Sequence, residues 1–179
     1  DPRRRRARLS LPVLIALLAA LLCNPVSAQT TDPAQPAPAP ADTVTVIAAG
    51  DIAKCNLEWD SYTGALLDNL PGTILGLGDN AYQIGSLQEF NDCYGPTWGR
   101  HLDRIYPVPG NHEYLTGGAE GYFTYFGDRA TPLEPGCRKE CKGYYSFNLG
   151  AWHIVALNSE IDNNPGSAQD QWLRADLAA

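Results

Sequence analysis

The chain has 179 residues, of which 44% are hydrophobic and 18% charged, and its formal net charge at pH 7 is −7. This composition fits one globular domain and excludes a disordered or fibrous chain. The acidic balance also argues against nucleic-acid binding through bulk charge, because such binding needs lysine and arginine to neutralise phosphates.

The first 28 residues have the pattern of a secretory signal peptide. Arginines at 3–6 precede an apolar run at 11–22 that is too short to span a bilayer, and small residues at 26–28 suit cleavage after Ala28. We therefore expect a secreted or periplasmic protein with no membrane anchor in its mature form. Residues 29–42 are rich in proline and alanine and predict an extended linker, so the folded domain at 43–179 should begin near Thr43.

After the linker, apolar runs alternate with helical patterns in the order strand, helix, strand, helix, strand. The expected strands end at Asp51, at Asp79 and, broken by proline, within 104–113; the expected helices lie at 58–70 and 86–93. The first helix has these residues on one face: Trp59, Tyr62, Leu66 and Leu70. This order is typical of right-handed βαβ units, so the sequence predicts an α/β fold with a parallel sheet.

The last part of the chain predicts a hairpin and a helix. Residues 144–158 read as two strands that turn at Leu149 and Gly150. Ser167 and Asp170 have the spacing of a capping box and predict the start of a final helix.

Four cysteines lie beyond the expected signal peptide: Cys55, Cys93, Cys137 and Cys141. An even number in an exported chain predicts disulfides, although the sequence leaves three connectivities open. We prefer Cys55 with Cys93 and Cys137 with Cys141. The alternatives are free buried thiols, or a metal-binding pair at the last two positions.

Polar clusters follow each of the three expected parallel strands. Asp51, Asp79 and Asn111 each come directly after a glycine, and the carboxyl ends of parallel strands form the ligand-binding edge of such sheets. Two carboxylates brought together repel each other unless a cation or a proton lies between them. Carboxylate and amide oxygens suit hard cations, so the pattern predicts a metal site. The alternative is three unrelated polar turns.

Three motifs in this order carry a resemblance to a known family: GDIA at 50–53, GLGDNAY at 76–82 and PVPGNHEY at 107–114. They resemble the first three motifs of the calcineurin-like metallophosphoesterases, in their exported bacterial form. The GDNAY stretch is similar to the purple acid phosphatase branch. The resemblance implies a β-sandwich flanked by helices in four layers. It also implies two metal ions, Fe(III) with a divalent Fe, Zn or Mn.

The resemblance also implies a role for each motif residue. Asp51 would bind the first metal, Asp79 would bridge both metals, and Tyr82 would give a phenolate to the first. Asn111 would bind the second metal. His112 would lie outside the metals and contact the phosphate or the leaving oxygen, with Glu113 as its partner by adjacency. The alternative for Tyr82 is an aromatic side chain that packs over the loop.

The implied reaction is hydrolysis of a small phosphate ester by a metal-activated water, most simply by a phosphomonoesterase of the acid or alkaline phosphatase type. The alternatives are a phosphodiesterase or nucleotidase on the same site, or a non-catalytic secreted binding protein. The later histidine motifs of the family are absent, and we expect His101 and His153 to be structural. The sequence therefore predicts an incomplete domain that is inactive when isolated.

Overall fold

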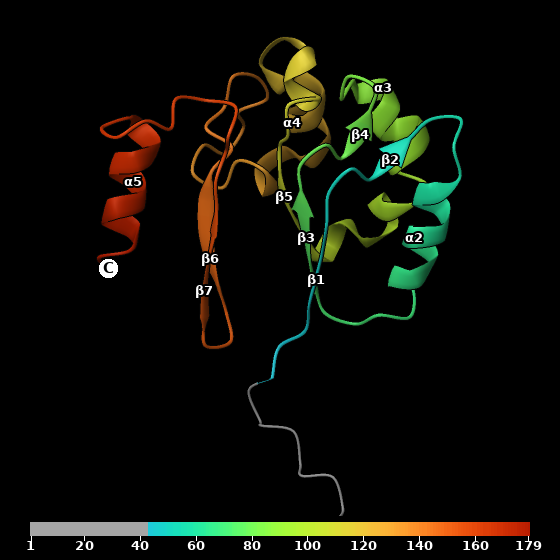
Figure 1. The fold of residues 1–179 in the computed structure, drawn as a ribbon, viewed down its shortest axis with the longest axis horizontal. Helices are drawn as coiled ribbons and strands as arrows, with labels where there is room; N and C mark the ends of the chain where they lie inside the picture. Colours follow the sequence, from blue (N-terminus) through green and yellow to red (C-terminus); the bar gives the residue numbers. More distant parts are fainter. Residues whose placement is uncertain (1–42) are drawn as a thin grey trace, which may run out of the picture. The chain divides into compact units, whose positions relative to one another are not determined.

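The computed structural model describes residues 43–179 (Figure 1). The expected signal peptide at 1–28 and linker at 29–42 lie outside the described residues. The strands are short and form three sheets: β1 (Val46–Ala49), β2 (Ala53–Lys54), β3 (Thr73–Leu77), β4 (Ala81–Tyr82), β5 (Ile105–Val108), β6 (Tyr145–Leu149) and β7 (Trp152–Ala156). The α-helices are α2 (Trp59–Leu67), α3 (Leu87–Glu89), α4 (Glu120–Phe126) and α5 (Ala168–Asp176). Short π- and 3₁₀-helical segments extend these: Phe90–Tyr94, Trp98–Arg104, Glu113–Leu115, Gly117–Ala119 and Gly127–Arg129.

The three expected parallel strands form one sheet in the order β1-β3-β5. Val46 pairs with Thr73, and Ile74 pairs with Ile105, so β3 is the central strand. The strand-helix-strand order of the sequence is thus confirmed as a mixed α/β fold with parallel pairing. A second parallel pair, β2 with β4, continues beyond the ends of β1 and β3.

The face of α2 that the sequence marked as apolar is exposed. Trp59, Tyr62 and Leu66 are 69%, 63% and 62% exposed, and the helix buries Asp60, Gly64 and Leu67 instead. A Cβ at Gly64 would lie 3.2 Å from the backbone of Thr97, so glycine lets the two segments approach closely. The buried face is set by this close approach and by hydrogen bonds rather than by apolar periodicity.

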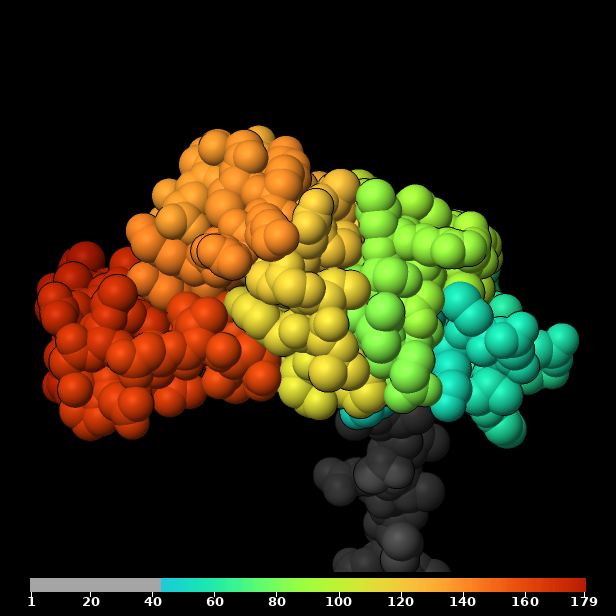
Figure 2. All heavy atoms as spheres, turned by 90° about the horizontal axis from the view of Figure 1, so that it is seen from above, coloured from blue at the N-terminus to red at the C-terminus, as the bar shows by residue number. Residues whose placement is uncertain are grey.

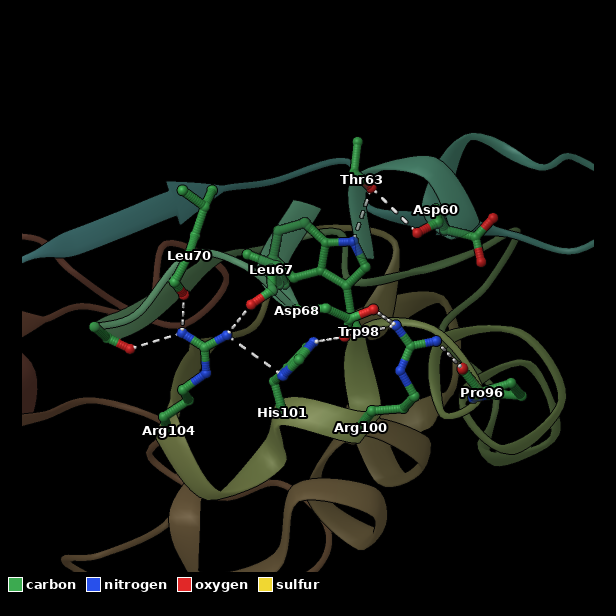
Figure 3. Close-up of polar contacts among 11 residues, drawn as sticks. Asp60, Thr63, Leu67, Asp68, Leu70, Pro96, Trp98, Arg100, His101 and Arg104 are labelled. Carbon is green, nitrogen blue, oxygen red and sulfur yellow. Dashed lines mark hydrogen bonds and ion pairs between the residues drawn. The ribbon is translucent and has the colours of Figure 1, made fainter. Parts of the chain in front are cut away.

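Polar side chains fix α2 against the 3₁₀ segment Trp98–Arg104 (Figure 3). Asp60 accepts a hydrogen bond from Thr97, and Trp98 donates to the hydroxyl of Thr63. The guanidinium of Arg104 donates to three carbonyl oxygens at the end of the helix and after it: Leu67 (2.6 Å), Leu70 (2.7 Å) and Gly72 (3.0 Å). Arg104 thereby satisfies carbonyl groups that a helix end leaves without partners.

Aromatic side chains form the part of the buried core that lies between α4 and the π-helical segment Phe90–Tyr94. Phe90, Tyr94, Tyr122 and Phe123 are 0% exposed. Edge-on contacts dominate, with ring centroids 5.6 Å apart for Phe90 and Tyr94 and 5.5 Å apart for Phe90 and Phe126. Edge-to-face pairs of this kind add to the stabilisation that burial alone provides.

The expected hairpin is present as β6 and β7, with Tyr145 opposite Ala156. It lies on the side of the three-stranded sheet opposite α2, and α5 lies beyond it (Figure 1). Tyr106 of β5 stacks on Phe147 of β6 at 3.8 Å between ring centroids. In residues 43–179 the second sheet has only these two strands, so the β-sandwich and its four layers are not confirmed.

The final helix starts where the sequence predicted. The Ser167 hydroxyl accepts a hydrogen bond from the backbone N–H of Asp170. His153 joins the hairpin to this helix, since its ring nitrogens lie 2.8 Å from Asn148 and 2.8 Å from Asp176. Nε2 of His101 lies 3.1 Å from Asp68, with Arg104 on its other nitrogen. Both histidines are therefore structural, as expected.

The four cysteines form the two expected pairs. The Cα atoms of Cys55 and Cys93 are 5.3 Å apart, and those of Cys137 and Cys141 are 6.0 Å apart, within the usual range for disulfides. The first bond ties the segment between β2 and α2 to the π-helical segment. None of the helices within 43–179 has the length and apolar character that a bilayer crossing needs.

Candidate functional site

Asp51 and Asp79 lie directly after the neighbouring strands β1 and β3, at one edge of the sheet. Backbone pairing continues past both strands, since Ile52 N–H donates to the Asp79 carbonyl at 3.0 Å. Both aspartates have left-handed backbones, with φ of 53° and 50°, which short polar side chains tolerate better than most. Two adjacent strand ends thus carry the two carboxylates that the sequence predicted to converge.

The Tyr82 hydroxyl lies between these carboxylates. It makes one hydrogen bond to Oδ1 of Asp51 and a second, of 3.0 Å, to Oδ2 of Asp79. One phenol proton serves two carboxylates in this arrangement. Burial, followed by the hydrogen bonds to Asp51 and Asp79, raises the pKa of the Tyr82 phenol above its ordinary value.

These three oxygens fit a hard cation. They converge from two chain segments, those of Asp51 and of Asp79 with Tyr82, so a cation would replace the shared proton and relieve the repulsion. Carboxylate and phenolate are hard oxygen donors. The fit is of oxygens only: within residues 43–179 no three His, Cys, Asp or Glu side chains cluster closely enough to hold a metal ion.

The loop after β5 reaches the same place. The backbone N–H of His112 donates to Oδ1 of Asp79 at 3.0 Å. A Cβ at Gly110 would collide with the Asp79 carboxylate, so only glycine allows this approach. Asn111, which the sequence assigned to the second metal, lies between Gly110 and His112 in the chain. Its side chain is exposed and makes no hydrogen bond with any residue in 43–179.

His112 presents one ring nitrogen for chemistry. Its Nδ1 lies 2.7 Å from the Gln83 carbonyl oxygen, which can only accept, so Nδ1 carries the proton. Nε2 has no hydrogen-bond partner among residues 43–179 and is then an acceptor in the neutral ring. The ring lies 4.5 Å from that of Tyr82, between centroids, so His112 borders the cluster without joining it.

Glu113 is not the partner of His112, and that expectation is wrong. Its buried carboxylate accepts four backbone N–H groups from two loops: those of Asn80 (2.7 Å), Gly110 (2.7 Å), Asp79 (2.9 Å) and Ala81 (3.2 Å). Burial raises the pKa of Glu113, while the N–H groups of Gly110, Ala81 and Asn80 oppose that rise. Glu113 therefore holds the loop that carries Asp79 against the loop that carries Asn111.

A cleft of about 400 Å³ opens beside the cluster. It is lined by Asp51, Ile52, Lys54, Leu57, Trp59, Tyr82, Gln83 and His112. Figure 2 views the face where the segment leading from β2 into α2, in cyan, meets the segment around β4, in green. Lys54 pairs with Tyr82 in the register of β2 and β4, and it brings a positive charge to the cleft.

One comparison with known proteins supports the motifs. No protein-family model matches the chain. The chain is similar to purple acid phosphatase 15 of Arabidopsis thaliana, with 30% identity over 139 aligned residues that cover 63% of this chain and 26% of the plant protein. It thus spans about a quarter of the length of this curated relative. The similarity supports the resemblance to metallophosphoesterases.

Several residues of this site were not predicted from the sequence, Leu57 and Gln83 among them. Lys54 and Trp59 line the cleft, yet neither belongs to a motif at a strand end. Glu113 was noticed only as a neighbour of His112. No local pattern marks its carboxylate as buried, because three of its four donors come from the distant loop at 79–81.

Proposed function

We propose that the protein is a metal-dependent phosphoric ester hydrolase, most simply a phosphomonoesterase that acts on small phosphate esters. The observation that carries this proposal is the convergence of Asp51, Asp79 and Tyr82 on one point at the ends of two parallel strands. The similarity to a plant purple acid phosphatase supports it. Two disulfides also fit an oxidising compartment, so export to the periplasm or the exterior is part of the proposal.

Residues of this chain would hold two cations. Asp51, Asp79 and Tyr82 would hold one cation, and Asp79 with the carbonyl oxygen of Asn111 would hold a second. Bound there, such cations would polarise phosphoryl oxygens and lower the pKa of water. Ferric iron beside a divalent iron, zinc or manganese suits this donor set, because phenolate and carboxylate are hard ligands.

His112 and Lys54 act on the substrate. The charge of Lys54 attracts the phosphate into the cleft. Nε2 of His112, left free by the bond from Nδ1 to Gln83, accepts a hydrogen bond from the phosphate monoanion in the neutral ring. In the protonated ring it gives its proton to the departing alkoxide. Gln83 fixes the orientation of the ring in both states.

The test is the colour and turnover of the full-length protein loaded with iron. A phenolate on ferric iron absorbs visible light, so we expect a coloured protein that hydrolyses phenyl phosphate and loses activity on chelation. Tyr82→Phe should remove the colour and leave the fold unchanged, whereas Tyr62→Phe, on the exposed face of α2, should keep it. Asp79→Asn should lower turnover by about 100-fold or more, since even partners of metal ligands matter by 10- to 100-fold.

Two results would contradict the proposal. Full turnover in metal-free buffer after chelation would exclude a metal-dependent reaction. Colour that survives Tyr82→Phe would show that Tyr82 does not bind the iron and is a packing residue.

A further inference from the structure

The cleft beside the candidate metal centre is lined by two chemically different groups of side chains. We call Asp51, Tyr82 and His112 the polar side of this lining, and Ile52, Leu57 and Trp59 its apolar side. A volume of about 400 Å³ has room for more than a phosphate group. A ligand that fills both sides must have a charged end and an apolar end.

Trp59 is not needed to hold its own helix. Its side chain is 69% exposed, while α2 packs through Asp60, Gly64 and Leu67 on the opposite face. Leu57, two residues earlier, is 46% exposed. Large apolar side chains left open beside a polar centre are typical of ligand-binding clefts.

The apolar side is also held in place before any ligand arrives. The disulfide between Cys55 and Cys93 anchors the segment, and Leu57 N–H donates to the Lys54 carbonyl at 3.1 Å. Trp59 is the first residue of α2, so the helix fixes its backbone. Little ordering is then required on binding, which favours affinity.

We propose that Trp59 and Leu57 form a subsite for the organic group of the phosphate ester and favour esters with a flat aromatic group. This inference rests on the proposed function. Lys54, the one lysine or arginine of the described chain that lines the cleft, and His112 draw the phosphate to the polar side. The organic group then lies against the indole, where aromatic rings stack favourably.

Phenylphosphonate and methylphosphonate test the subsite without chemistry, because neither is hydrolysed. Calorimetric titration of the full-length, metal-loaded protein should show that phenylphosphonate binds about five- to tenfold more tightly, the size expected for one aromatic stacking contact. Trp59→Ala should remove this preference and leave methylphosphonate affinity unchanged, and Trp59→Phe should restore most of it. Tyr62→Ala is the matched control, since Tyr62 is equally exposed on α2 but does not line the cleft.

The possible outcomes distinguish a failure of the subsite proposal from a failure of the proposed hydrolase function. A preference for phenylphosphonate that survives Trp59→Ala, or an equal loss for both ligands, overturns the subsite. Binding of neither phosphonate overturns the subsite and the phosphate site together. A preference that depends on Trp59 without turnover of phenyl phosphate supports the subsite and refutes the hydrolase.

Discussion

At the scale of single residues, one buried carboxylate organises the candidate site. Glu113 is 0% exposed and accepts N–H groups from both the Asp79 loop and the Gly110 loop. It does not line the cleft. Its hydrogen bonds act on the backbone of the loops that carry Asp79 and Asn111, so Glu113 is a positioning residue.

Glu113→Gln should destabilise the protein by about 2–4 kcal/mol. The amide has one acceptor oxygen in place of two, so two of the four backbone N–H groups would face an N–H₂ group and lose their partner. Urea denaturation gives the free energy of unfolding. Glu120→Gln on α4 is the control: its ion pair with Lys139 is exposed, and we expect a change below about 0.5 kcal/mol. Equal effects of the two substitutions would refute the positioning role.

At the scale of elements, α2 depends on partners that are distant in sequence. The helix has no side-chain cap at Glu58, and no basic residue lies in its last turn. Arg104, more than thirty residues later, supplies the missing donors to its end (Figure 3). Because such partners are distant in sequence, the apolar periodicity of residues 58–70 predicted the helix but not the face that it buries.

Arg104→Ala should therefore lower the free energy of unfolding by about 2–3 kcal/mol, because it leaves partly buried carbonyl groups without donors. Arg100→Ala is the matched control on the same segment. Its guanidinium pairs with Asp68 at 2.9 Å, but both side chains are nearly half exposed. Exposed pairs contribute about 0–1 kcal/mol. A larger loss with Arg100→Ala than with Arg104→Ala would contradict this account of α2.

At the scale of the whole molecule, the candidate site joins strand ends that are distant in sequence. Asp51 follows β1, Asp79 follows β3, and Tyr82 lies in β4. A cation held by these three binds the folded state only, because the unfolded chain does not bring them together. Metal binding should then stabilise the fold by mass action.

Metal loading should raise the melting temperature of the full-length protein. With metal at 100 times its dissociation constant the gain is about 2.7 kcal/mol, which corresponds to a rise of about 5–10 °C for a domain of this size. Differential scanning calorimetry with iron, and again after chelation, measures it. Asp79→Asn should abolish most of the rise. An unchanged rise in this variant would show that the metal binds elsewhere.

Sequence alone determined the parts of this protein that depend on local pattern. The β1-α2-β3 order, the hairpin turn near Gly150, the Ser167 cap and the pairing of Asp51 with Asp79 at strand ends all follow from periodicity, turn chemistry and parallel topology. Tertiary structure alone decided the exposed face of α2 and the donors to Glu113. It also decided the position of Trp59 in the cleft. The physical reason is the sequence separation of the interacting residues: a helix or turn depends on residues only a few positions apart. The donors to a buried carboxylate such as Glu113 depend on which distant segment packs against it.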